Sequence, residues 1–265
     1  MIVPKLPAHS PKATIEQLIG VTDVKVTYAR PSVKGRTIFG DLVPFGRVWR
    51  TAANAGSYIS FSTPVILAGV PVPAGEYGIL TVPGQDRWQV MLNTSLKTIL
   101  SVPYDPALNV LDVDVPVEEA PFTETFTIAF EQFGVDSAVL AITWERTRIA
   151  LKLEAPALEL GLANIDEAMA QPDVTPMVMH SCASFCYDRG VRLKEALEWS
   201  RASVEKEPKF FSVRMLALLY AANGMKKEAI EMARRSAELS RAAGQDGFVR
   251  LNEDKIREWE GELVG

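Results

Sequence analysis

The chain has 265 residues, of which 48% are apolar and 23% are charged, and its formal net charge is −5 at pH 7. This length allows one large domain or two ordinary ones, and the composition is that of a globular protein. A mildly acidic chain does not favour nucleic acid as its partner, and we expect no membrane span because no run of eighteen apolar residues occurs.

The first half of the chain reads as short strands separated by turns. After an extended, proline-rich arm (1–12), we expect strands at 14–19, 21–28, 58–61, 65–67, 76–82, 88–93, 110–115, 122–133, 137–144 and 148–153. Gly69 and residues 71–75 read as turn, and residues 94–109 as a looser segment. Many short strands without an intervening helical pattern favour a sandwich or barrel. We expect an antiparallel β-sandwich over residues 1–153.

The composition changes at Glu154, where apolar residues begin to recur every three or four positions. We therefore expect an α-helical domain over residues 154–265. Gly190 and the stretch 195–200 are echoed by Gly224 and the stretch 228–233. This pattern resembles the tetratricopeptide repeat, which implies about two helical hairpins, flanked here by helices at 156–170 and 246–260. Such a stack either forms a small peptide groove or packs on the β-domain or another copy, and we expect packing.

The stretch from Tyr28 to Asn54 is dense in Gly, Pro, Arg and aromatic residues. Between Arg30 and Arg50 it carries five basic residues and one acid, Asp41. This stretch is therefore positively charged, whereas the chain as a whole is negatively charged. Arginine suits planar contact with carboxylate or phosphate, and aromatic rings can stack on cations. The candidate ligand-binding residues here are Arg30, Lys34, Arg36, Arg47, Trp49, Arg50 and Asn54. In the alternative, structural reading, the arginines bond loop carbonyls and Trp49 covers the edge of the core.

The same stretch, YARPSVKGRTIFGDLVPFGRVWRTAAN, is followed by similar landmarks at residues 73–77, 82–84, 88, 104–106, 122–128 and 144–145. Together they resemble the bacterial family called domain of unknown function 2911, over about residues 10–153. That family usually has Gly and Glu where this chain has Ala52 and Ala55. The resemblance implies that the chain shares the family's fold and is exported from the cytoplasm, but it implies no activity. We expect a periplasmic or cell-surface protein whose signal peptide is absent from this chain, the alternative being a cytoplasmic one.

The sequence contains no nucleotide-binding fingerprint, P-loop, His-Glu-x-x-His motif, calcium loop or nucleophile elbow. We expect no cofactor and no metal. His180 and Cys182 lie two positions apart and would point to different faces of a helix, which argues against a nucleophilic pair. Cys182 and Cys186 share a helix face. They could offer two sulfurs to zinc, but we expect them to be small core residues.

Glu76 follows Pro-Ala-Gly at the start of an expected strand. It could pair with an arginine of the preceding loop, or act as an acid or base if it is desolvated. Asn54 and Tyr58 could add hydrogen bonds to a site built from the arginines, which would suit a carboxylate, phosphate or sugar acid.

Three functions are compatible with these residues. We expect a non-catalytic, exported binding or assembly protein, which takes a small anionic or sugar-like ligand and contacts a protein partner or another copy through its helical domain. The second is an enzyme, a hydrolase or isomerase for an anionic or carbohydrate substrate, that uses Glu76 with the arginines. The third is a purely structural interaction protein.

Overall fold

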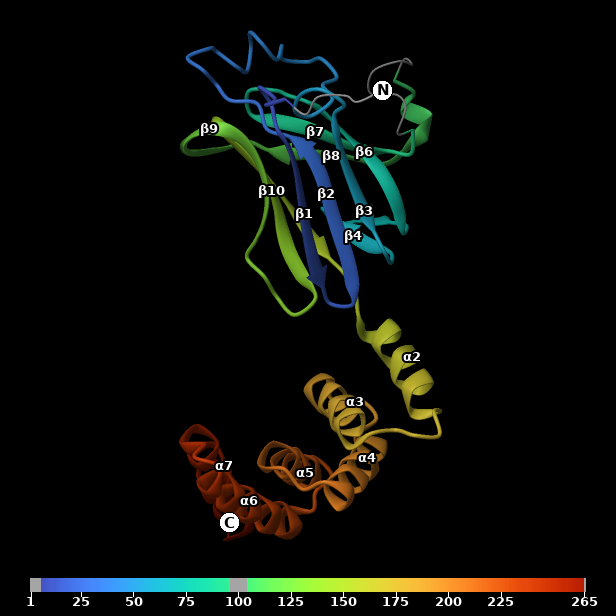
Figure 1. Cartoon of the computed structure of the whole chain (residues 1–265), viewed down its shortest axis with the longest axis vertical. Coiled ribbons are helices and arrows are strands. Elements are labelled where there is room, and N and C mark those ends of the chain that lie inside the picture. Colours follow the sequence, from blue (N-terminus) through green and yellow to red (C-terminus); the bar gives the residue numbers. More distant parts are fainter. Residues whose placement is uncertain (1–5, 96–103, 265) are drawn as a thin grey trace. The chain divides into compact units, whose positions relative to one another are not determined.

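A computed structural model describes residues 6–95 and 104–264. Residues 1–5 of the expected arm and 96–103 of the expected loose segment lie outside the described residues. Within these two described ranges, the chain forms two antiparallel sheets followed by six helices (Figure 1). This confirms the expected order of a β region and then an α region. The chain divides into two compact units, residues 1–160 and 161–265.

The larger sheet has six strands in the order β1-β2-β3-β6-β7-β8. Their bounds are β1 Lys12–Ile19, β2 Thr22–Ala29, β3 Ser57–Phe61, β6 Gly75–Val82, β7 Arg87–Asn93 and β8 Asn109–Pro116. The smaller sheet has the order β5-β4-β10-β9. Its strands are β4 Val65–Leu67, β5 Val70–Val72, β9 Glu118–Glu131 and β10 Ser137–Glu154. All paired neighbours are antiparallel.

Two strands differ from the prediction. The stretches 137–144 and 148–153 form one strand, β10, whose register with β9 shifts on both sides of Glu145. A bulge therefore separates them, and Glu145 has a positive φ of 53° there. Residues 70–72, expected as part of a turn, form the edge strand β5. An edge strand accepts Pro71 because the missing N–H is not needed on its outer side.

The inward-facing side chains of both sheets belong to one apolar core. Val26 and Ile59 of the larger sheet and Phe126 of the smaller one are fully buried in it. Tyr28 crosses this core: its hydroxyl donates to the carbonyl of Ile128 at 3.0 Å, and its ring meets Phe126 edge-on. The alternation of buried and exposed residues along β2 follows from the two-residue period of a strand.

The helices are α2 Leu158–Met169, α3 Pro176–Arg189, α4 Leu193–Lys206, α5 Phe210–Ala222, α6 Lys226–Ala242 and α7 Asp246–Val264. The start of α3 shows a local cause: Thr175 caps the helix by accepting the N–H of Val178, and Pro176 occupies the first turn. Gly190 ends α3 with a φ of 66°, a conformation that glycine adopts without strain. Among the described residues, no helix is long and apolar enough to cross a bilayer.

The two helical hairpins, α3–α4 and α5–α6, repeat one contact. Ser203 of α4 donates from Oγ to the carbonyl of Pro176 at the start of α3, at 2.7 Å. Ser236 of α6 donates in the same way to the carbonyl of Phe210 at the start of α5, also at 2.7 Å. Each serine thus ties the second helix of its hairpin to the first turn of the first helix.

Candidate functional site

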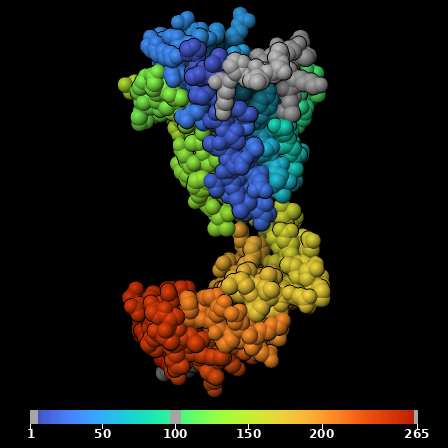
Figure 2. Space-filling view, in the orientation of Figure 1, coloured from blue at the N-terminus to red at the C-terminus, as the bar shows by residue number. Residues whose placement is uncertain are grey.

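The segment between β2 and β3, residues 30–56, is called the basic loop below. It closes one end of the two sheets (Figure 1), and Figure 2 shows most of it in lighter blue at that end of the β unit. Ser32 bridges to Thr125 of β9, and Trp49 bridges to Thr81 of β6. Trp49 and Thr81 exchange two backbone hydrogen bonds, of 2.7 and 2.9 Å. The loop is therefore attached to one strand of each sheet.

Arg30 and Arg36 hold this loop in place. Arg30 donates from Nε to the carbonyl of Phe126 at 3.3 Å and from Nη2 to the hydroxyl of Thr127 at 3.0 Å. Arg36 donates to the carbonyls of residues 32 and 33, at 2.6 and 2.9 Å. These contacts agree with the alternative in which the arginines stabilise the loop. The guanidinium of Arg30 binds β9, and that of Arg36 binds carbonyls of the loop itself.

Trp49 is half-buried among aromatic residues of the core. Its ring stacks on Trp144, with centroids 6.2 Å apart and planes 12° apart. It also meets Phe39, Trp88 and Phe126 edge-on, at centroid distances of 6.1, 6.0 and 5.7 Å. The indole thus joins the loop to the core and leaves little of its face for a ligand.

Lys34, Arg47 and Arg50 behave differently, because their side chains are exposed. None of the three side chains has a hydrogen bond or ion pair with the part of the chain that the structure describes. Only the backbone N–H of Lys34 is engaged, with Oε1 of Glu124 at 2.9 Å. The loop therefore carries uncompensated positive charge on its outer side.

The remaining two predicted site residues, Asn54 and Glu76, line a cavity of about 310 Å³. Lys12, Thr27 and Tyr58 contribute to the same cavity. The side chains that line the cavity therefore include an ammonium group, a carboxylate, a carboxamide and two hydroxyl groups. We call it the outer-face cavity, because it lies on the side of the larger sheet that points away from the core.

The strand register explains why these side chains meet. Tyr58 of β3 is paired with Thr27 of β2, and Ser60 of the same strand is paired with both Lys25 and Glu76. Because successive side chains of a strand point to opposite faces, this set shares the outer face. The intervening residues of each strand point into the core, where they are buried.

Hydrogen bonds and charges shape the outer-face cavity. Burial raises the pKa of Tyr58, and the negative charge of Glu76 raises it further. The phenol is therefore protonated at neutral pH, and it donates to the carbonyl of Ala55 at 2.9 Å. Asn54 donates from Nδ2 to the carbonyl of Ser10 at 3.0 Å. That bond leaves the carboxamide oxygen of Asn54 as an acceptor.

A second cavity, of about 560 Å³, adjoins the first on the same face. Its polar lining consists of Glu16, Gln17, Asp23, Lys25, Ser60 and Ser62. Ser60 lines this second cavity, and its direct strand partner Glu76 lines the outer-face cavity. The two cavities therefore lie side by side. Lys25 is paired with Glu16 at 2.7 Å, which, with a smaller effect of Glu76, raises the pKa of Lys25.

The structure does not bring Glu76 to the arginines. Glu76 begins β6, whereas the loop meets this strand at Thr81, roughly 16 Å further along at the usual rise of a strand. Glu76 is exposed, and the described lining of its cavity includes no arginine. Cations that do lie near Glu76 are Lys12, which lines the same cavity, and Lys25, whose pKa the charge of Glu76 helps to raise.

The cysteines and His180 lie in the helical unit. Cys182 and Cys186 are buried in its apolar core, and burial raises the pKa of both thiols. Within residues 6–95 and 104–264, no group of three or more His, Cys, Asp or Glu side chains could hold a metal ion. The ring of His180 packs on Phe211 with centroids 5.0 Å apart, and burial lowers the pKa of His180.

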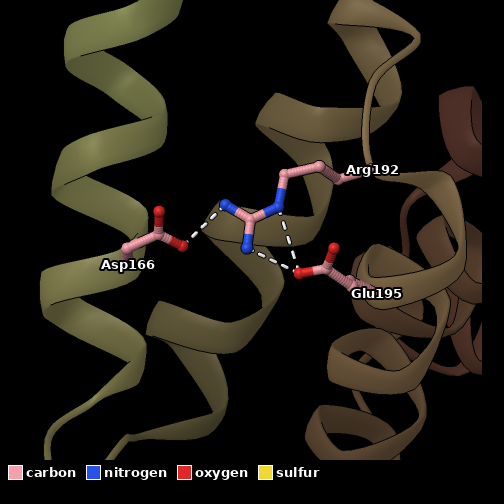
Figure 3. A network of polar contacts seen from close by, with 3 residues as sticks. All are labelled: Asp166, Arg192 and Glu195. Atoms are coloured by element: carbon pink, nitrogen blue, oxygen red, sulfur yellow. Dashed lines mark hydrogen bonds and ion pairs between the residues drawn. The ribbon is translucent and has the colours of Figure 1, made fainter.

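One polar network was missed by the sequence reasoning. Arg192, between α3 and α4, binds Asp166 of α2 and Glu195 of α4 (Figure 3). Its guanidinium also lies 5.3 Å from the ring centroid of Trp199. The pair with Glu195 is readable as a spacing of three on a helix. The pair with Asp166 joins residues too far apart in the sequence to be inferred.

Comparison with known proteins gives one match. A family model described as "Protein of unknown function (DUF2911)" matches residues 10–153. No curated protein and no solved structure matches the chain. The match covers the strands from β1 to most of β10 and none of the six helices. Because residues 10–153 are more than half of the sequence, the chain belongs to the DUF2911 family.

Proposed function

We propose that this chain is a non-catalytic binding protein whose ligand site is the outer-face cavity. The observation that carries the proposal is the meeting of Asn54, Tyr58 and Glu76 with Lys12 and Thr27 around one hollow of about 310 Å³. In this proposal the two sheets form an antiparallel β-sandwich, and their shared core holds the outer face in a fixed shape. A rigid sheet that displays polar side chains in a hollow is suited to bind a small molecule.

The chemistry of the lining favours a neutral, sugar-like ligand over an anion. One carboxylate, Glu76, and one ammonium group, Lys12, balance each other, so the lining has no excess of positive charge. The hydroxyl groups of Thr27 and Tyr58 and the carboxamide of Asn54 both donate and accept hydrogen bonds. A polyhydroxylated molecule needs such groups, and the half-buried ring of Tyr58 offers an apolar surface beside them.

The helical unit is the protein-contact part of the molecule in this proposal. Its two hairpins, with their repeated serine contacts, support a tetratricopeptide-like stack. Met177 of α3 and Leu251 of α7 are each 48% exposed, which supplies apolar area for a partner or a second copy. Light scattering of the full chain tests self-association: a strict monomer at every concentration would leave only a different protein as the partner.

The proposed location is outside the cytoplasm. The thiols of Cys182 and Cys186 are buried, and their raised pKa keeps them protonated. Both are therefore poor targets for oxidation in an oxidising compartment such as the periplasm. Fractionation of cells that produce the protein naturally tests this part. Recovery of the protein only in the cytoplasmic fraction would refute it.

Calorimetric titration with neutral mono- and disaccharides and with sugar acids tests the ligand site. We expect a neutral sugar to bind, and Glu76→Gln and Tyr58→Phe each to weaken binding by about 10-fold, because each removes a polar partner. Asp114→Asn is the matched control, since Asp114 is exposed on β8 of the same sheet but does not line the cavity. No heat with any sugar, or equal binding by all variants, would refute the site.

A further inference from the structure

The basic loop exposes large apolar side chains on its outer side. Leu42 is 48% exposed, Val48 47% and Phe45 38%. The loop's other large apolar residues face inward and belong to the core or pack against it: Val33, Ile38, Phe39, Val43 and Trp49. The loop therefore has two sides, and apolar side chains on the outer one are not needed to fold the β unit.

Exposed basic residues lie in the same loop as these apolar side chains. Lys34, Arg36, Arg47 and Arg50 are all exposed in the same loop. Asp41 is the only acid between residues 30 and 50, and Glu124 of β9 is the described carboxylate bound to the loop backbone. Since the whole chain carries −5, the loop is a local region of opposite sign.

The outer side of the loop is held in one shape by backbone hydrogen bonds. Gly40 donates to the carbonyl of Val43 at 2.9 Å, and Gly46 donates to the carbonyl of Pro83 at 2.9 Å. The ring of Phe45 lies so close over Gly40 that a Cβ there would be 2.9 Å from a ring carbon. The exposed side chains are thus displayed without a large ordering cost on binding.

We propose that the outer side of the basic loop docks on the surface of a bilayer that contains anionic phospholipids. Leu42, Phe45 and Val48 would enter the boundary between headgroups and acyl chains, while the basic residues would lie at the level of the phosphates. A purely acidic partner would use the charges but leave the apolar side chains in water. The negative charge elsewhere on the chain is repelled by such a bilayer, which orients the loop toward it.

Sedimentation of the full chain with vesicles tests the proposal. We expect the protein to sediment with vesicles of phosphatidylcholine mixed with phosphatidylglycerol, and not with phosphatidylcholine alone. Added salt should release it, because exposed charges are screened. Absence of binding to the mixed vesicles would overturn the proposal, and it would leave the sugar titration of the outer-face cavity unaffected.

Two pairs of variants separate this docking from general charge effects. Arg47→Glu with Arg50→Glu should lower vesicle partitioning at least about 10-fold. Arg235→Glu with Arg250→Glu changes the net charge equally, at exposed positions of α6 and α7, and should lower it much less. Circular dichroism of each variant confirms that it is folded. Equal losses from both pairs would overturn the proposal.

The apolar contribution is tested in the same way. Leu42→Ser with Val48→Ser should lower partitioning about 10-fold, because exposed apolar area is removed. Val135→Ser, at an 80% exposed position between β9 and β10, is the control and should have no effect. If the serine variants in the loop bind as well as the unchanged chain, the surface contacts anions by charge alone and the bilayer proposal is wrong.

Discussion

Arg192 and Asp166 lie 2.7 Å apart, between Nη1 and Oδ1, and so join α2 to the beginning of α4 (Figure 3). Arg192 makes this contact from a left-handed backbone conformation, with a φ of 48°. Its carboxylate partners raise its pKa above the ordinary value, with Glu195 contributing most. The guanidinium is therefore charged at neutral pH, as arginine is in proteins generally.

Asp166→Asn should lower the free energy of unfolding of the helical unit by less than about 1 kcal/mol. The carboxylate of Asp166 is 63% exposed, so solvent screens the pair. Urea unfolding followed by circular dichroism measures the change. Asp173→Asn is the control, because Asp173 is exposed and has no hydrogen bond or ion pair with the described residues. A loss of several kcal/mol would mean that the pair is far less screened than its exposure indicates.

Ala52→Gly should stabilise the β unit. Ala52 is 5% exposed and has a φ of 109°, in a region that L-residues rarely adopt. Glycine adopts such a φ without a steric penalty. Relief of this strain is worth on the order of 1 kcal/mol, net of the greater freedom of glycine in the unfolded chain.

Thermal unfolding compares Ala52→Gly with Ala53→Gly. Ala53 does not have a positive φ, so its replacement only increases the entropy of the unfolded chain and should lower the melting temperature. Equal shifts in the two variants would show that the conformation of Ala52 is not strained.

The sequence predicted most strands because buried and exposed residues alternate along them, as Val24, Val26 and Tyr28 do in β2. The edge strand β5 was missed because Pro71 reads as a turn signal, although a proline is acceptable at an edge. The change to helices could be predicted because apolar residues recur every three or four positions from Glu154 onward.

The candidate site was only partly predictable. Asn54 and Glu76 were both singled out, but their meeting depends on the pairing of β3 with β2 and with β6, which local patterns do not specify. Arg30 was a candidate ligand contact with a structural role as the alternative, and the structure shows it donating to the carbonyl of Phe126, 96 positions away. Contacts between such distant residues are set by the packing of the two sheets.

Trp49→Ala should destabilise the β unit by about 3 kcal/mol, since a large ring would be removed from the aromatic core. Phe45→Ala, on the outer side of the same loop, should cost less than about 1 kcal/mol because Phe45 is not part of the core. Urea unfolding of both variants measures the difference. Equal costs would contradict the division of the loop into an inner and an outer side.

His180 should make the helical unit less stable as the pH falls below about 6.5. Its pKa in the folded state is lowered by burial, and the buried Nδ1 has no hydrogen-bond partner among the described residues. The unfolded chain therefore binds a proton at His180 more readily than the folded chain does. As the pH falls below the unfolded-state pKa of about 6.5, the free energy of unfolding falls with it.

The measurement is urea unfolding of the full chain at a series of pH values between about 5 and 8, the range in which an ordinary histidine titrates. In His180→Phe, whose ring can still pack on Phe211, the stability change in this range should be much smaller. His9→Phe is the control, because His9 is exposed and is the only other histidine. If His180→Phe retains the full pH dependence, the titrating group is a different one and burial of the imidazole is not its cause.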